Sequence, residues 1–130
     1  MNDDTNDWRE LREFAGVELT DSFVLSWDHV AGALLIDVDV CLAPSHPFYE
    51  EPRPAEGACI RAATLEFPYC TSLTAGTAND PAETVKTLGN GRIDGLRRTG
   101  DGRYEMTGAF GRVEIVSERP LLRLKGPVAP

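Results

Sequence analysis

The strongest indication of the fold lies in residues 22–42, SFVLSWDHVAGALLIDVDVCL, which have the pattern of one β-hairpin. With Ala31 and Gly32 at the tip, the two strands face each other in a register that puts the apolar side chains on one face. Three pairs form this face: Phe23 with Val40, Leu25 with Val38, and Trp27 with Ile36. The alternate face is mostly polar, which predicts a sheet with one side in the core and the other in solvent.

Turn residues divide the second half of the chain into further short strands. Residues 58–69 alternate between apolar and polar side chains. Residues 83–88 fit either a helical turn or a strand, and the following Asn90-Gly91 favours a strand because this dipeptide is preferred in two-residue hairpins. Gly100-Asp101-Gly102 fits a three-residue hairpin loop. That loop would place Leu96 opposite Met106 and Arg97 opposite Glu105.

A short helix is expected before the hairpin, over residues 7–14. Asp7 suits its N-cap, and Gly16 would end it. With a last strand at 121–125, the chain is predicted to be an all-β protein, either an antiparallel β-sandwich or a partly open barrel. We expect about seven or eight short strands. Residues 1–6 form a polar acidic tail, and residues 7–130 form a single all-β domain.

Charge and cysteine usage restrict the classes of function. The 130 residues contain 21 acidic and 13 basic side chains, for a formal net charge of −8. Such a surface repels nucleic acid and anionic lipid and accepts a basic protein more easily as partner, although modest negative charge is also a common aid to solubility. Neither a signal peptide nor an apolar stretch of membrane-spanning length is visible. Cys41, Cys59 and Cys70 form no CxxC motif, so a cytoplasmic location is expected.

The chain contains no established catalytic motif, and no cofactor is indicated. Asp37 and Asp39 share one face of a strand, so they are a candidate site for a divalent cation or for acid–base chemistry, although any strand with a solvated face shows the same pattern, which favours that simpler interpretation. His29 and His46 are predicted to lie at opposite ends of the hairpin, too far apart to share a metal ion. No serine or cysteine has an obvious histidine partner in the sequence.

The most promising candidate site is the proline-rich loop of residues 43–57. Aromatic and charged residues on a constrained loop are typical of protein interfaces. The candidate binding residues are His46, Phe48, Tyr49, Glu50, Glu51 and Arg53. Alternatively, Phe48 and Tyr49 pack over one end of the core as a cover.

Two functions are compatible with these observations. The first is a non-catalytic protein-binding module, such as an inhibitor or immunity-like protein for a basic partner. The second is a β-barrel enzyme or binding protein that uses a small ligand or a divalent cation at Asp37 and Asp39. A homo-oligomer is also possible, because exposed strand edges need covering.

Overall fold

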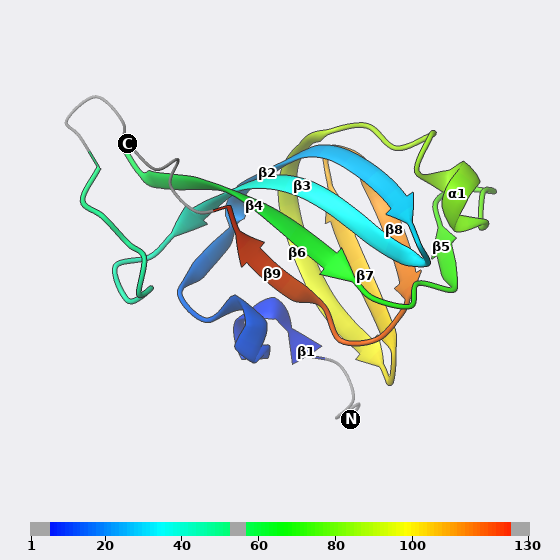
Figure 1. Ribbon diagram of the computed structural model, residues 1–130, viewed down its shortest axis with the longest axis horizontal. Helices are drawn as coiled ribbons and strands as arrows, with labels where there is room; N and C mark the ends of the chain where they lie inside the picture. Colours follow the sequence, from blue (N-terminus) through cyan, green and yellow to red (C-terminus); the bar gives the residue numbers. More distant parts are fainter. Residues whose placement is uncertain (1–5, 53–56, 126–130) are drawn as a thin grey trace.

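In a computed structural model, the described residues, 6–52 and 57–125, form a nine-stranded antiparallel sheet that curls into two facing halves (Figure 1). The strands are β1 (Asn6–Asp7), β2 (Val17–Val30), β3 (Ala33–Leu42), β4 (Cys59–Phe67), β5 (Ser72–Thr74), β6 (Gly91–Gly100), β7 (Arg103–Gly108), β8 (Gly111–Val116) and β9 (Leu121–Leu124). Their order is β5-β8-β7-β6-β2-β3-β4-β9, with β1 paired to β6. The all-β fold class predicted from the sequence is therefore confirmed.

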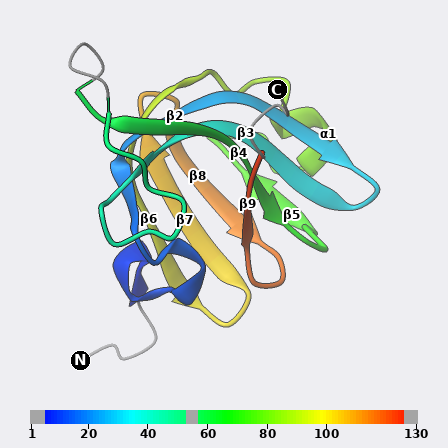
Figure 2. The same cartoon turned by 60° about the vertical axis from the view of Figure 1, so that its left-hand side comes forward.

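The hydrophobic core lies between the two halves of the sheet. One half contains β2, β3, β4 and β9, and the other contains β6, β7, β8 and β5 (Figure 2). Alternate apolar residues of both halves point inward and are buried, among them Leu34, Ile36, Leu65, Phe67, Leu96, Met106 and Ile115. The outward residues of the same strands are mostly polar, as the period of two predicts.

The β2–β3 hairpin confirms the predicted register only near its tip. Trp27 faces Ile36 as expected, but a bulge at Leu25 shifts the pairing, so that Phe23 faces Asp39 instead of Val40. One extra residue in a strand turns every following side chain to the opposite face. Phe23 and Leu25 are therefore 44% and 48% exposed, and their predicted core positions are wrong.

A second irregularity in β2 explains why Ser22 is buried. Here β2 holds more residues than the facing part of β3, which leaves ladder groups without a backbone partner. The Ser22 hydroxyl accepts a hydrogen bond from the Cys41 amide at 3.0 Å and donates one to the Glu18 carbonyl at 3.0 Å. The serine side chain thus replaces the missing backbone pairing. Its two hydrogen bonds offset the free-energy cost of burying the hydroxyl.

The predicted N-terminal helix consists of two 3₁₀ turns, Trp8–Glu10 and Arg12–Phe14. Asp7 is the N-cap, as predicted, and its carboxylate accepts a hydrogen bond from the Arg9 amide at 3.1 Å. Trp8, Leu11 and Phe14 are all buried against one end of the sheet. Their spacing of three residues matches the repeat of a 3₁₀ helix better than that of an α-helix.

The strand predicted over residues 83–88 is wrong. The segment begins with a short α-helix, α1 (Pro81–Thr84), and continues into turns, while Gly91 starts β6 instead of forming a hairpin tip. The Trp27 indole donates a hydrogen bond to the Gly89 carbonyl at 2.6 Å, which fixes this segment over β2. Tertiary packing of an aromatic side chain has therefore overridden the local turn preference of Asn90-Gly91.

The pairing predicted across the Gly100-Asp101-Gly102 loop is confirmed. Leu96 faces Met106 and Arg97 faces Glu105, as the Gly100-Asp101-Gly102 loop predicts. At the two edges of the sheet, β9 pairs with β4 and β5 pairs with β8. The pairing with β4 brings the end of β9 beside the proline-rich loop.

Candidate functional site

The loop after β3 is fixed by a chain of backbone hydrogen bonds. The Ala43 amide donates to the Gly16 carbonyl at 2.8 Å, the His46 amide to Ala43 at 2.9 Å, and the Tyr49 amide to His46 at 3.0 Å. Gly16 has a φ of +77°, and a Cβ placed on it would lie 2.9 Å from the His46 Cα. The loop backbone therefore packs directly against the chain that enters β2, at a position that only glycine fits.

A groove of about 520 Å³ lies between this loop and the ends of β4 and β9. Pro47, Phe48, Tyr49 and Glu50 line it from the loop, and Arg61, Leu124 and Lys125 line it from the sheet. Most of the lining surface is apolar. Mostly apolar concave surfaces with a few charged groups at the edge are typical of binding sites.

The aromatic residues of the loop divide into a floor and a rim. Tyr49 is half-buried and packs against the hydrophobic core. Phe48 is 65% exposed, and its ring lies 5.8 Å from the His46 ring between centroids. The prediction of a core cover thus describes Tyr49, whereas Phe48 remains available to a ligand.

The charged residues of the groove are arranged as partly exposed ion pairs. Glu50 lies 3.3 Å from Arg61, and Lys125 lies 3.3 Å from Asp37. Glu51 is exposed and forms no ion pair with the described residues. Exposed pairs contribute little to stability and exchange easily for a partner's charges.

The structure brings together four of the six predicted binding residues, namely His46, Phe48, Tyr49 and Glu50. The His46 ring accepts a hydrogen bond from the Phe48 amide at 3.0 Å, which shows that its immediate role is to shape the loop. Glu51 follows at the exposed end of the loop, and Arg53 lies outside the described residues. The predicted site is therefore a contiguous surface, although its use as a site stays a prediction.

The sequence did not indicate the half of the groove that comes from the sheet. Arg61 is part of an ordinary alternating strand, Leu124 is the last residue of β9, and Lys125 follows it directly. They reach the loop only because β9 pairs with β4. No local pattern reports that pairing.

The two aspartates proposed for a cation lie on the outer face of β3, where Asp37 has three polar partners. Asp37 accepts hydrogen bonds from Ser26 at 3.3 Å and Thr64 at 3.4 Å, in addition to its pair with Lys125. Within residues 6–52 and 57–125, no three His, Cys, Asp or Glu side chains are grouped as a metal ion would require. The ammonium of Lys125 occupies the place at Asp37 that a cation would take.

The three thiols lie in buried positions. Cys41, Cys59 and Cys70 are all buried and free. Burial raises the pKa of the Cys41 thiol, and the nearby Asp21 and Glu18 carboxylates raise it further. Burial also raises the pKa of Cys70 to about 11. Since the thiolate is the reactive form, these environments oppose nucleophilic chemistry.

Comparison with known proteins gives no family, since no family model, no curated protein and no solved structure matches this chain. In the part of the chain that the structure describes, no helix is long and apolar enough to cross a membrane. The functional argument therefore rests on the groove and its charges.

Proposed function

We propose that this chain is a non-catalytic protein-binding module, of the inhibitor or immunity-like kind, whose groove receives an apolar side chain of a basic protein. The observation that carries the proposal is the exposed Phe48 ring on a loop whose backbone is already fixed. An ordered aromatic side chain loses little conformational entropy on binding, so more of its contact energy appears as affinity.

Charge supports a basic partner. The net charge of −8 attracts a cationic protein over a distance, and Glu50 and Glu51 put two carboxylates next to the groove. Such charges increase the association rate, while the apolar contact slows dissociation. We therefore expect the affinity to fall with salt, without vanishing.

The experiment starts from a partner captured with the tagged chain from the native host's lysate and then purified. Its dissociation constant is measured at about 0.1 M and 0.5 M salt, where exposed charges are weakly and strongly screened. Phe48→Ala is expected to weaken binding by about tenfold or more. Tyr69→Ala is the matched control, because Tyr69 is another exposed aromatic side chain, 76% accessible, in the turn after β4.

The charge component is tested by replacing Glu50 and Glu51 together with glutamine. We expect a lower association rate and a weaker dependence on salt, with a nearly unchanged dissociation rate. If Phe48→Ala and Tyr69→Ala bind the purified partner equally well, the groove is not the binding site and the proposal fails.

A further inference from the structure

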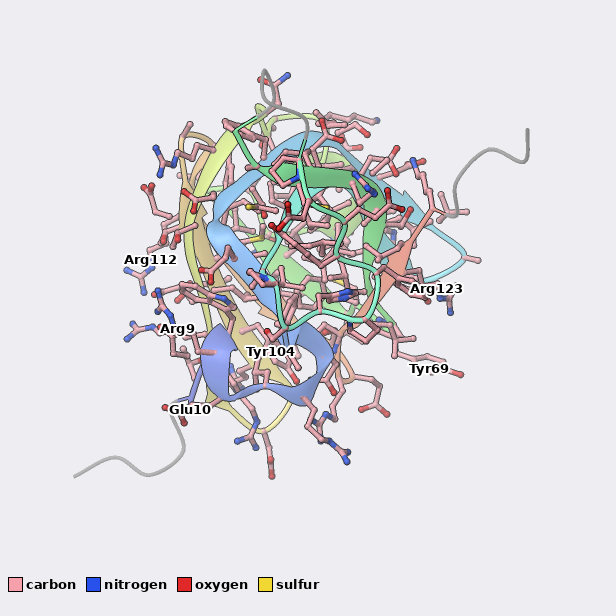
Figure 3. The ribbon with its side chains drawn as sticks, turned by 90° about the vertical axis from the view of Figure 1, so that its left-hand side faces the viewer. Arg9, Glu10, Tyr69, Tyr104, Arg112 and Arg123 are labelled. Atoms are coloured by element: carbon pink, nitrogen blue, oxygen red, sulfur yellow. The ribbon has the colours of Figure 1, made fainter. Side chains whose placement is uncertain are left out.

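A second cavity, of about 570 Å³, lies at the end of the sheet that the 3₁₀ turns cover. Three segments far apart in the sequence line it: the first 3₁₀ turn with Glu10, the β6–β7 hairpin, and the connection from β8 to β9. Figure 3 shows Tyr104 behind the ribbon of the 3₁₀ turns, with Glu10 at their edge. Most of the lining surface is polar, in contrast to the groove at Phe48.

The two arginines that line this cavity already have carboxylate partners. Arg119 lies 2.9 Å from Glu13, and Arg98 pairs with Asp101. An anionic ligand would have to compete with these carboxylates for the guanidinium groups. The arginines therefore act as part of the wall, each beside a carboxylate of the protein.

Glu118 and Tyr104 present hydrogen-bonding groups to the cavity that the described residues leave unused. The Glu118 carboxylate forms no ion pair with the described part of the chain, and the Tyr104 hydroxyl forms no hydrogen bond there. Tyr104 is only 3% exposed, its ring packs against the Phe67 ring with centroids 5.6 Å apart, and the residue lines this cavity from β7. Among the described residues, the Tyr104 hydroxyl is not one of the fully buried polar atoms that lack a partner, so it reaches the solvent of the cavity, and a ligand can take the place of water there.

The charges of the lining favour a cation. Three carboxylates, those of Glu10, Asp101 and Glu118, face two guanidinium groups. We propose that this cavity binds a guanidinium or ammonium group, with Glu118 as its counter-ion and the Tyr104 hydroxyl as a hydrogen-bond acceptor. The cation can come from a free amine or from an arginine or lysine side chain of a protein, since the recognising chemistry is the same. This site is independent of the groove at Phe48.

The test uses the intact chain and small capped amino acids, with binding followed by the amide NMR shifts of Gly102 and Tyr104. Capped arginine and capped lysine are expected to shift these signals in a saturable way. Capped citrulline has nearly the shape of arginine without its charge, and we expect it to bind about tenfold more weakly or not at all. Agmatine and a Gly-Arg-Gly peptide then separate the two sources: tighter binding of agmatine assigns a free amine, and tighter binding of the peptide assigns a protein side chain.

Two variants connect binding to the proposed residues. Glu118→Gln is expected to weaken binding of capped arginine about tenfold, and Tyr104→Phe about threefold. Glu83→Gln on α1 changes the net charge equally outside the cavity lining and should leave binding within twofold. Equal binding of citrulline and arginine, equal effects of Glu118→Gln and Glu83→Gln, or saturable binding of acetate in place of arginine would each overturn the proposal.

Discussion

The groove at Phe48 and the cavity at Tyr104 have similar volumes, about 520 and 570 Å³, and opposite construction. The groove is shaped by backbone hydrogen bonds and an apolar floor, with charges only at its edge. The cavity is shaped by polar and charged side chains from three segments, around the hydroxyl of an otherwise buried tyrosine. Volume alone therefore says little about which ligand binds. The polarity and charge of the lining residues determine which ligands bind favourably.

The largest loss of stability is expected for a substitution at Gly16, where the loop backbone packs against the chain that enters β2. Gly16→Ala places a methyl group 2.9 Å from the His46 Cα at a φ of +77°. We expect a loss of about 3 kcal/mol of unfolding free energy, from left-handed strain together with overpacking. Urea denaturation followed by tryptophan fluorescence measures it.

Gly32→Ala provides the matched control for Gly16→Ala. Gly32 has a φ of +83°, but a Cβ there would meet no atom within 4 Å. It should lose only the strain contribution, about 1 kcal/mol. If the two variants were equally stable, the loop would not be held against Gly16, and the groove would lack its rigid wall.

Tyr49 in the floor of the groove and Phe48 at its rim should contribute differently to the unfolding free energy. Tyr49→Ala removes a half-buried ring that packs against the core, and we expect a loss of about 2 kcal/mol. Phe48→Ala removes a mostly exposed ring and should change stability by less than about 0.5 kcal/mol. Equal losses in urea denaturation would mean that Phe48 is a structural cover and is not available for binding.

The groove at Phe48 could be predicted in part from the sequence, whereas the cavity at Tyr104 could not. The loop half of the groove could be predicted, because prolines and aromatic residues between two strands form a local pattern. The cavity at Tyr104 could not, because Glu10, Tyr104 and Glu118 are each ordinary for their own segments. Only the long-range arrangement of the strands brings them together, and pairing between distant strands is not encoded in local periodicity.

The β2–β3 hairpin shows the same limit on a smaller scale. The prediction identified both strands, the tip and the Trp27–Ile36 pair, all of which follow from alternation and turn chemistry. It missed the bulges, because the Ser22 hydroxyl that fills one of them looks like any polar residue of a solvated face. Bulges are stabilised by such tertiary hydrogen bonds, so alternation is reliable only between them.

A smaller effect is expected from divalent cations at the edge of the groove. A metal ion at Asp37 would have to displace the ammonium of Lys125, which lines the groove. We expect calcium, magnesium, manganese and zinc at about 5 mM to move the melting temperature by less than about 1 °C. A rise of several degrees that Asp37→Asn abolishes would instead support the cation-dependent function and would change the charge at the groove.

The smallest effect at neutral pH is expected for Tyr104→Phe, because its hydroxyl forms no hydrogen bond within the described residues. Removal of a hydroxyl that is hydrogen-bonded within the protein costs about 1 kcal/mol, whereas removal of one that contacts only solvent is nearly neutral. We therefore expect the unfolding free energy at pH 8 to change by less than about 0.5 kcal/mol. A larger loss would mean that Tyr104 already has a partner, and the cavity would lose its acceptor.

At alkaline pH, Tyr104→Phe should become more stable than the parent protein. Burial raises the pKa of the Tyr104 phenol above its ordinary value near 10, so the unfolded chain releases this proton first. The contribution of the neutral phenol to stability is complete below pH 10 and is lost as the pH rises through the native pKa. As the pH rises above 10, the parent protein should lose stability relative to Tyr104→Phe, as measured by urea denaturation. If the two proteins lost stability in parallel, the phenol would be open to water, and the cavity at Tyr104 would be no more selective for a cation than the exposed edge of the groove.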